Sequence, residues 1–470
     1  RNGDPPETLN IGPGGPIKTD SLKEALFCFA GTIIDEEDRY KALKSLIVQE
    51  IPRVKNLRRG KKIIDESREA IPQIIKTVAS LNHSHVFIQG PPGTGKTYTA
   101  AHVILDLIKR GHRIAVSSNS HKAINNLLSQ VEYFAKAQNI RFRGIKKSNK
   151  LNPDSAFEGE FISNVLSNPE AEGFEGQLVA GTAWLFSRDS FDQAFDYLFV
   201  DEAGQVALAN LIAMGTCAKN IVLLGDQMQL AQPIQGVHPG RSGESTLDYL
   251  LNGMATIPRE RGIFLKTTRR MHHDVCQFIS EAVYDGRLTE EPDNNRRHLV
   301  LGKKPHPLLR SSGIRYIPST HEGCSQRSEE EAFLVRDLYK SLLKQKYTDK
   351  IGTVKPVNQE NILVVAPYNM QVNLLKRTLP AGARIGTVDK FQGQEAEVVI
   401  VSMATSSGDD LPRHIEFLYS KNRLNVAISR AKCLAILVAN PALMAIRCTT
   451  PEQMALVNTL CWVKDYSDIN

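Results

Sequence analysis

One short segment of this chain has the residue types and the spacing to hold phosphate. Residues 90–97 read Gly-Pro-Pro-Gly-Thr-Gly-Lys-Thr and fit the P-loop pattern G-x-x-x-x-G-K-[ST]. Backbone N–H groups of such a loop, together with the positive end of the following helix, attract phosphate oxygens. Lys96 would reach the terminal phosphates, and the Thr97 hydroxyl would bind Mg²⁺. The predicted phosphate-binding residues are Gly90, Pro91, Pro92, Gly93, Thr94, Gly95, Lys96 and Thr97.

Two further groups of polar residues follow apolar runs. Asp201 and Glu202 come directly after Tyr197–Val200, about 105 residues beyond the P-loop. A carboxylate pair at the carboxyl end of a parallel strand can bind Mg²⁺ through the first acid and polarise an attacking water through the second. Gln229 follows the apolar run 221–224, and its amide could sense the terminal phosphate. We therefore predict Thr97 and Asp201 as metal ligands and Lys96, Glu202 and Gln229 as catalytic groups.

The elements that must position these groups alternate between strand and helix patterns. A short strand is expected at 86–88, and apolar residues recur at helical spacing across 98–109. Such alternation predicts parallel sheets in an α/β fold. Further strands are expected in a first series at 113–117, 178–181, 197–200 and 220–224, and in a second series at 262–266, 313–318, 361–366, 383–387, 397–403 and 433–438.

The two series predict two α/β domains with a cleft between them. We expect an N-terminal helical and basic segment over 1–65, with a Pro- and Gly-rich loop over 1–20. The first domain would cover 66–260, with a polar insertion or subdomain at about 131–176, and the second would cover 261–470.

The composition narrows the class of protein. The 470 residues carry a net charge of +7, which permits a polyanionic partner. No apolar run is long enough to span a membrane, and the seven cysteines include no C-x-x-C pair. We expect an intracellular protein, cytoplasmic and of bacterial type. Because the chain begins at Arg1, a nuclease or another domain could precede it.

Beyond these elements, the motifs follow the order found in superfamily 1 helicases, which the chain resembles over residues 73–440. The matching segments are 118–123 (SNSHKA), 180–183 (AGTA), 265–272 (LKTTRRMH), 386–395 (GTVDKFQGQE) and 423–432 (RLNVAISRAK). The last three resemble subfamily B, the group of the nonsense-mediated-decay and Okazaki-processing helicases. Residues 120–128 and 236–239 resemble more narrowly the helicase half of bacterial RecB-like nuclease–helicase fusions.

The resemblance implies two tandem RecA-like domains with small helical insertions, hydrolysis of ATP with Mg²⁺, and monomeric action. Arg270 and Arg430 resemble the family's arginine fingers; both are expected from the second domain, so that hydrolysis requires the cleft to close. Glu395 resembles the ribose-contacting acid, and Gln73 the adenine-reading glutamine. Where the family usually has an aromatic residue that stacks on adenine, this chain has Arg269, which leaves base selectivity open.

Contacts to a nucleic-acid strand are expected from both domains. The candidates are Ser120, His121, Lys122, Thr182, Pro367, Tyr368, Thr387 and Lys390. Tyr368 could stack on a base or be a half-buried residue at a strand end. Basic clusters at 53–62 and 141–150 could bind the backbone or form a solvated surface.

These observations favour an ATP-dependent translocase or helicase on single-stranded DNA, and the resemblance to subfamily B implies movement 5′ to 3′. Two alternatives remain: an RNA helicase or RNA–protein remodeller of the same subfamily, and a nucleotide-gated clamp that holds nucleic acid without moving. A simple P-loop kinase or GTPase would leave the motifs after residue 260 unexplained.

Overall fold

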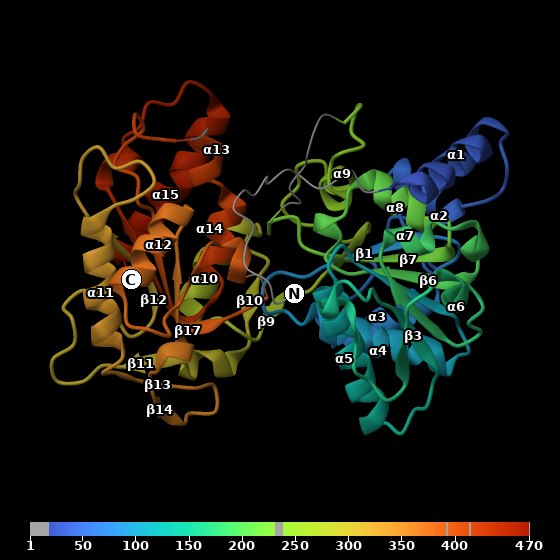
Figure 1. Cartoon of the computed structure of the whole chain (residues 1–470), viewed down its shortest axis with the longest axis horizontal. Helices are drawn as coiled ribbons and strands as arrows, with labels where there is room; N and C mark the ends of the chain where they lie inside the picture. Colours follow the sequence, from blue (N-terminus) through green and yellow to red (C-terminus); the bar gives the residue numbers. More distant parts are fainter. Residues whose placement is uncertain (1–17, 231–237, 392, 413–414, 470) are drawn as a thin grey trace, which may run out of the picture.

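The computed structural model describes residues 18–230, 238–391, 393–412 and 415–469. Two α/β lobes lie side by side, joined by a narrow waist at β9 and β10 (Figure 1). Part of the predicted N-terminal loop, and Gly236 and Val237 of the RecB-like signature, lie outside the described residues.

The first lobe is built on an eight-stranded sheet in which all paired strands are parallel, in the order β4-β3-β5-β2-β6-β7-β1-β8. Its strands are β1 His85–Gln89, β2 Ile114–Ser117, β3 Gly144–Lys147, β4 Ile162–Val165, β5 Leu178–Gly181, β6 Phe195–Val200, β7 Ala218–Gly225 and β8 Gly262–Phe264. Its helices are α1 Asp20–Ile34, α2 Lys41–Ile47, α3 Ala70–Ala79, α4 Lys96–Lys109, α5 His121–Ala137, α6 Asn168–Glu172, α7 Ala183–Phe186, α8 Leu208–Gly215 and α9 Thr246–Leu251.

Both faces of this sheet are buried, as its nearly continuous apolar strands require. Successive β1 residues point to opposite faces, so Val86 and Ile88 pack in one core with α4 and α5, whereas Phe87 packs in another with α8 and α9. Helix α5 buries Ile124, Leu127, Leu128 and Val131, one apolar stripe at helical spacing.

The second lobe contains a five-stranded parallel sheet in the order β12-β18-β17-β15-β16. Its strands are β12 Gly313–Pro318, β15 Ile362–Val365, β16 Arg384–Gly386, β17 Ala396–Ser402 and β18 Ala431–Ala439. Its helices are α10 His273–Val283, α11 Glu329–Leu342, α12 Asn369–Thr378, α13 Ile415–Leu418, α14 Lys421–Ile428 and α15 Pro451–Ile469. Strands β9 Thr267–Thr268 and β10 Thr289–Glu290 pair at the waist, and a small antiparallel sheet combines β11 His298–Val300, β13 Lys346–Thr348 and β14 Val354–Pro356.

The predicted fold class, two tandem RecA-like sheets, is confirmed, with two corrections. The stretch 131–176 is no separate subdomain, because β3 and β4 extend the edge of the first sheet. The strand expected at 262–266 belongs to the first sheet, since Gly262–Phe264 pairs with Phe87–Gln89. Alternating sequence patterns predict strands but not which sheet receives them.

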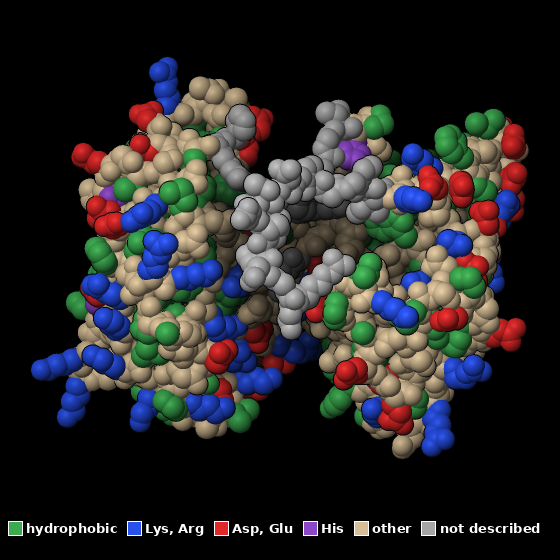
Figure 2. All heavy atoms as spheres, in the orientation of Figure 1, with side chains coloured by type: hydrophobic (Ala, Val, Ile, Leu, Met, Phe, Trp, Pro, Cys, Tyr) green, Lys and Arg blue, Asp and Glu red, His purple; other side chains and the backbone are tan. Residues whose placement is uncertain are grey.

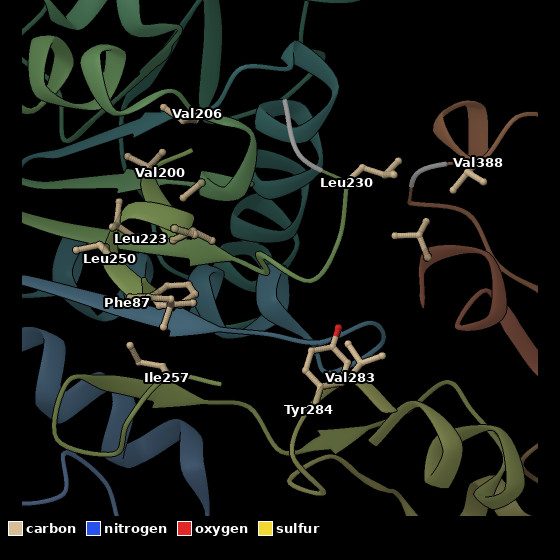
Figure 3. Close-up of a cluster of buried hydrophobic side chains, with 14 of the residues drawn as sticks. Phe87, Val200, Val206, Leu223, Leu230, Leu250, Ile257, Val283, Tyr284 and Val388 are labelled. Carbon is tan, nitrogen blue, oxygen red and sulfur yellow. The ribbon is translucent and has the colours of Figure 1, made fainter. Parts of the chain in front are cut away.

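One apolar core runs continuously from the first lobe into the second. Its buried side chains include Phe87, Leu223 and Leu250 from the first lobe and Tyr284 and Val388 from beyond the waist (Figure 3). The two lobes are therefore packed against each other at the base of the cleft.

Candidate functional site

The P-loop occupies the turn between β1 and α4, where its glycines are sterically required. Gly93 and Gly95 have φ of +77° and +83°, which side chains on L-residues rarely adopt. A Cβ on Gly90 would lie 2.1 Å from Cγ of Lys96. The Lys96 ammonium donates to the Gly90 carbonyl oxygen at 2.8 Å. The Lys96 side chain is thus folded back over the P-loop, where a phosphate is predicted to bind.

Asp201 and Glu202 lie at the carboxyl end of β6, in the sheet that also carries β1. Asp201 is buried, and Glu202 has a φ of +52° that turns the chain sharply. Burial, and then the Glu202 carboxylate, raise the pKa of Asp201 to about 7, although Lys96 acts in the opposite direction. A buried carboxylate crowded by a second one suits a divalent cation.

The residues present therefore fit Mg²⁺, which proteins commonly hold through one or two side chains together with substrate phosphates. Asp201 would supply a carboxylate, and Thr97, in the first turn of α4, a hydroxyl. Among the described residues, no group of three or more His, Cys, Asp or Glu side chains could hold a metal. Both metal-ligand assignments remain predictions.

Arg430 is a buried cation without a carboxylate partner in the described part of the chain. Its side chain precedes β18, its Nη1 donates to the Gln394 carbonyl at 3.1 Å, and its buried Nε has no hydrogen-bond partner. Burial, and then the neighbouring Arg270, lower the pKa of Arg430 to about 9, while Glu202 acts in the opposite direction. An anion between these two adjacent guanidinium groups, near the P-loop, would offset their mutual repulsion.

Arg270 lies between the P-loop and the second domain. Its Nε donates to Glu395 at 2.7 Å, and its Cβ is 2.6 Å from where a Cβ on Gly93 would lie. The preceding residues are bonded to the P-loop: Thr268 Oγ1 donates to the Pro92 carbonyl at 2.9 Å, and the Arg269 N–H donates to that of Gly93 at 2.9 Å. Arg270 therefore follows a segment bonded to the P-loop, while its own Nη1 donates to the Ser429 carbonyl of the second domain at 3.1 Å.

The Glu395 carboxylate forms ion pairs with two cations. It accepts from Arg270, and its other oxygen lies 3.1 Å from the Lys432 ammonium. Partial burial would raise its pKa, but Arg270 and Lys432 outweigh burial and lower the pKa to about 2. Its contact with a ribose remains a prediction.

A cavity of about 240 Å³ opens beside the P-loop between Thr94, Ile71 and Arg269. Arg269 Nη1 lies 3.5 Å from the Thr94 carbonyl and its Nε 3.4 Å from Glu291. Gln73 does not line the cavity, because its amide accepts from the Asp65 N–H at 2.8 Å and donates to the carbonyls of Asp65 and Glu69. Arg269 thus lines this cavity, and the base contacts of both Arg269 and Gln73 remain predictions.

Gln229 belongs to a buried network that also contains side chains from beyond the first domain. Its amide donates to Asp226 at 3.0 Å, and the Tyr284 hydroxyl donates to the same carboxylate oxygen at 2.6 Å. Asn425 of α14 donates to the Met228 carbonyl at 2.8 Å and contacts the Tyr284 hydroxyl at 2.9 Å. Burial raises the pKa of Asp226.

Sequence reasoning assigned no role to Asp226, Tyr284, Asn422 or Asn425. Asn422 donates to the carbonyls of Gln227 and Gln229, at 2.9 and 2.8 Å. Asp226 and Asn425 lie inside recognised motifs, so their positions carried some signal. Tyr284 follows α10 in an unremarkable apolar stretch, and only the folded chain brings it to Asp226.

The predicted strand contacts gather at the carboxyl ends of strands in both sheets. Ser120, His121 and Lys122 begin α5 after β2, and Thr182 follows β5. In the second domain, Pro367 and Tyr368 follow β15, and Thr387 and Lys390 follow β16. Tyr368 is only 4% exposed, with its ring 5.6 Å from that of Phe417. Its ring is therefore not available for stacking, which corrects that interpretation.

Lys146, part of the basic cluster predicted at 141–150, is fully buried. Its ammonium lies 3.0 Å from Nδ1 of His121 and donates to the carbonyls of Lys147 at 3.0 Å and Ser155 at 3.2 Å. Burial, and then Lys147, lower the pKa of Lys146 to about 8, and burial, and then Lys146, lower the pKa of His121. The Lys146 ammonium therefore contacts the His121 ring from within the protein and does not face solvent.

Two family models, each described as an AAA domain, match residues 72–245 and 244–442. The helicase/nuclease JHS1 of Arabidopsis thaliana is 25% identical and covers 88% of this chain and 32% of its own length. The helicase/nuclease DNA2 of Gallus gallus is 26% identical (79% and 37%), and a regulator of nonsense transcripts 1 homologue of Drosophila melanogaster is 27% identical (79% and 34%). The arterivirus nonstructural protein 10 helicase structure is 14% identical, with a TM-score of 0.42 and coverage of 76% of this chain and 60% of that one.

The two matched AAA domains together span residues 72–442, and the relatives named DNA2 and JHS1 are ATP-dependent helicase/nucleases by name. The chain belongs to superfamily 1, among helicases of the DNA2 and nonsense-transcript-regulator type, as the motifs predicted. It spans about a third of the length of these three relatives. Among the described helices, none has the length and apolar character to cross a membrane. The narrower RecB-like resemblance stays a prediction.

Proposed function

We propose that this chain is an ATP-driven motor that moves 5′ to 3′ along single-stranded DNA. The observation that carries the proposal is the bonding of Asn422 and Asn425, on α14, to the loop that holds Gln229. A loop that senses the terminal phosphate is thereby tied to a helix of the other domain. Loss of that phosphate could then change how the domains sit on the strand.

The hydrolytic roles follow from position and charge. The P-loop amides and Lys96 bind the phosphates, and Mg²⁺, when bound, offsets the charge that develops on them. Glu202 polarises the attacking water, and Arg270 and Arg430 stabilise negative charge in the transition state. Asp226 orients the Gln229 amide toward the phosphate.

The strand would run over the carboxyl edges of the two sheets. Ser120 and Lys122 offer a hydroxyl and an ammonium to the backbone, and Thr387 and Lys390 offer the same pair from the second domain. With its Nδ1 facing Lys146, His121 would present Nε2–H as a donor. Such contacts bind phosphates without reading base sequence.

Three relatives are named for DNA work and favour the DNA reading: JHS1, DNA2, and a DNA polymerase alpha-associated DNA helicase of Schizosaccharomyces pombe. The nonsense-transcripts homologue keeps RNA as the second candidate. Steady-state ATP hydrolysis with oligo-dT, oligo-U or duplex DNA tests the choice. Stimulation by oligo-dT alone supports a DNA motor, whereas equal or greater stimulation by oligo-U favours RNA. Translocation toward a 3′-end block then tests direction.

A clamp that binds nucleic acid without moving is the remaining alternative. A clamp need not keep every hydrolytic group, yet Lys96, Asp201, Glu202, Gln229, Arg270 and Arg430 are all present. Slow hydrolysis that no nucleic acid stimulates, combined with tight strand binding, would support the clamp over the motor.

A further inference from the structure

The positive charge of this chain is concentrated on one small part of the second lobe. We call residues 296–310 and 340–356, which contain β11, β13 and β14, the basic sheet. It has ten Lys and Arg residues and one acid, Asp349, a net charge of +9. The whole chain carries +7, so all other residues together carry −2. The basic residues are Arg296, Arg297, Lys303, Lys304, Arg310, Lys340, Lys344, Lys346, Lys350 and Lys355.

Most of these cations face solvent without a carboxylate partner. All are exposed except Arg297, which is half-buried. Within the basic sheet, all of which the structure describes, only Arg296 and Lys355 form ion pairs, with Asp293 at 3.4 Å and Asp349 at 2.7 Å. Figure 2 shows Lys and Arg side chains gathered over the lower part of this lobe, where Figure 1 labels β11, β13 and β14. The basic sheet therefore presents mostly unpaired positive charges to solvent.

The basic sheet lies away from the predicted strand track. The Leu299 N–H donates to the Ser311 carbonyl at 2.7 Å, just before β12, and the Val357 N–H donates to the Gln345 carbonyl at 3.0 Å, just before β15. Both bonds place it at the amino ends of the second sheet, whereas Thr387 and Lys390 lie at a carboxyl end. Strand β18 has nine residues, about 30 Å of extended chain. One single strand on the track would not also cover this surface.

We propose that the basic sheet binds the backbone of double-stranded nucleic acid, the part of the substrate that is not in the track. Proteins that hold single strands combine cations with exposed aromatic rings on which bases stack. The one aromatic residue of the basic sheet, Tyr347, is partly buried in the core. Cations without stacking rings suit the phosphates of a duplex, whose bases are already stacked.

The test neutralises four exposed, unpaired lysines in the variant Lys303→Gln/Lys304→Gln/Lys346→Gln/Lys350→Gln. Affinity is measured by fluorescence anisotropy over a salt series, for a DNA duplex with a short 5′ dT tail and for the tail alone. We expect affinity for the tailed duplex to fall at least about tenfold, and its log–log salt slope to shrink by about three to four. Affinity for the tail, and oligo-dT-stimulated hydrolysis, should not change. Unchanged hydrolysis also shows that the variant is folded.

A matched variant removes four exposed lysines that lie outside the second lobe: Lys18→Gln/Lys23→Gln/Lys76→Gln/Lys109→Gln. It should leave duplex affinity within about twofold of the original chain. Three results would overturn the proposal: unchanged duplex affinity in the basic-sheet variant, an equal loss for the tail alone, or an equal loss in the matched variant. The first would leave an acidic protein as the partner to examine, the second would assign the surface to single strands, and the third would indicate a general effect of net charge. The motor proposal is separate, since it depends on stimulated hydrolysis and movement.

Discussion

Asn425 and Met228 belong to different lobes, yet the Asn425 amide donates to the Met228 carbonyl at 2.8 Å. The same amide group lies 2.9 Å from the Tyr284 hydroxyl, which donates to Asp226. One side chain of α14 therefore holds both the backbone of the loop that contains Gln229 and the tyrosine that donates to Asp226. Movement of the second lobe cannot leave this loop undisturbed.

Replacing Asn425 with Ala should weaken the link between α14 and the loop that contains Gln229, without removing a charged group and with the two Asn422 bonds left in place. Two hydrogen bonds of about 1 kcal/mol each are lost, so kcat for stimulated ATP hydrolysis should fall about tenfold or more. Nucleotide affinity should stay within about twofold, as measured by equilibrium titration. The control is Asn373→Ala, an exposed residue of α12. Equal effects of the two substitutions would contradict the role of Asn425.

Glu202→Gln should keep ATP binding yet nearly abolish turnover. Only the water-polarising carboxylate is lost, and general-base groups contribute about 10²–10⁴-fold. Single-turnover hydrolysis with radiolabelled ATP measures the chemical step directly. Retention of more than about a tenth of the original rate would remove Glu202 from this role.

Arg430→Ala should lower turnover at least about 10²-fold while leaving strand binding intact. The Arg430 guanidinium is buried, lacks a carboxylate partner in the described chain and is repelled by Arg270. Its removal should therefore lower the melting temperature proportionally less than it lowers activity. Thermal unfolding and oligo-dT binding, measured on the same preparation, separate these effects. Collapse of strand binding would make Arg430 a strand contact or a structural residue.

Lys146→Met should raise the pKa of His121. Burial, and then the Lys146 cation, hold that pKa below its usual value of 6.5, so the folded protein keeps the imidazole neutral at neutral pH. Without the ammonium, the ring should take up a proton at higher pH, and affinity for oligo-dT should rise more steeply as pH falls through about 6.5. Proton NMR titration of the His121 ring measures the shift. Lys150→Met, which removes an exposed ammonium, should leave the pKa where it is.

The P-loop turn and the carboxylate pair could be located from local sequence, because each is local in the fold. Gly90 to Thr97 form one turn between a strand and a helix, and Asp201 and Glu202 end one strand. Their function depends on neighbours in sequence, so spacing and residue type carried the information. The overall pair of parallel sheets followed from the same alternation.

Contacts between distant segments were not predictable in this way. Lys146 looks like a surface lysine in sequence, but folding places it behind His121, where three acceptors surround its ammonium. Tyr368 follows a strand in a position typical of a base contact, yet packing near Phe417 buries it. No local pattern distinguishes a solvated cation or ring from one enclosed by another segment.

The number of residues between the end of β8 and Arg270 fixes how far Arg270 lies from the P-loop. After Phe264 leaves the first sheet, five residues lead to Arg270, and two of them are bonded to P-loop carbonyls. This stretch is a short connection from β8, which lies beside β1, the strand that precedes the P-loop. Adding one extended residue would move the guanidinium by about 3.4 Å, more than the length of a hydrogen bond. The first sheet thus sets the distance from the phosphate site to the Arg270 backbone, whereas Glu395 and Ser429 of the second lobe hold its guanidinium.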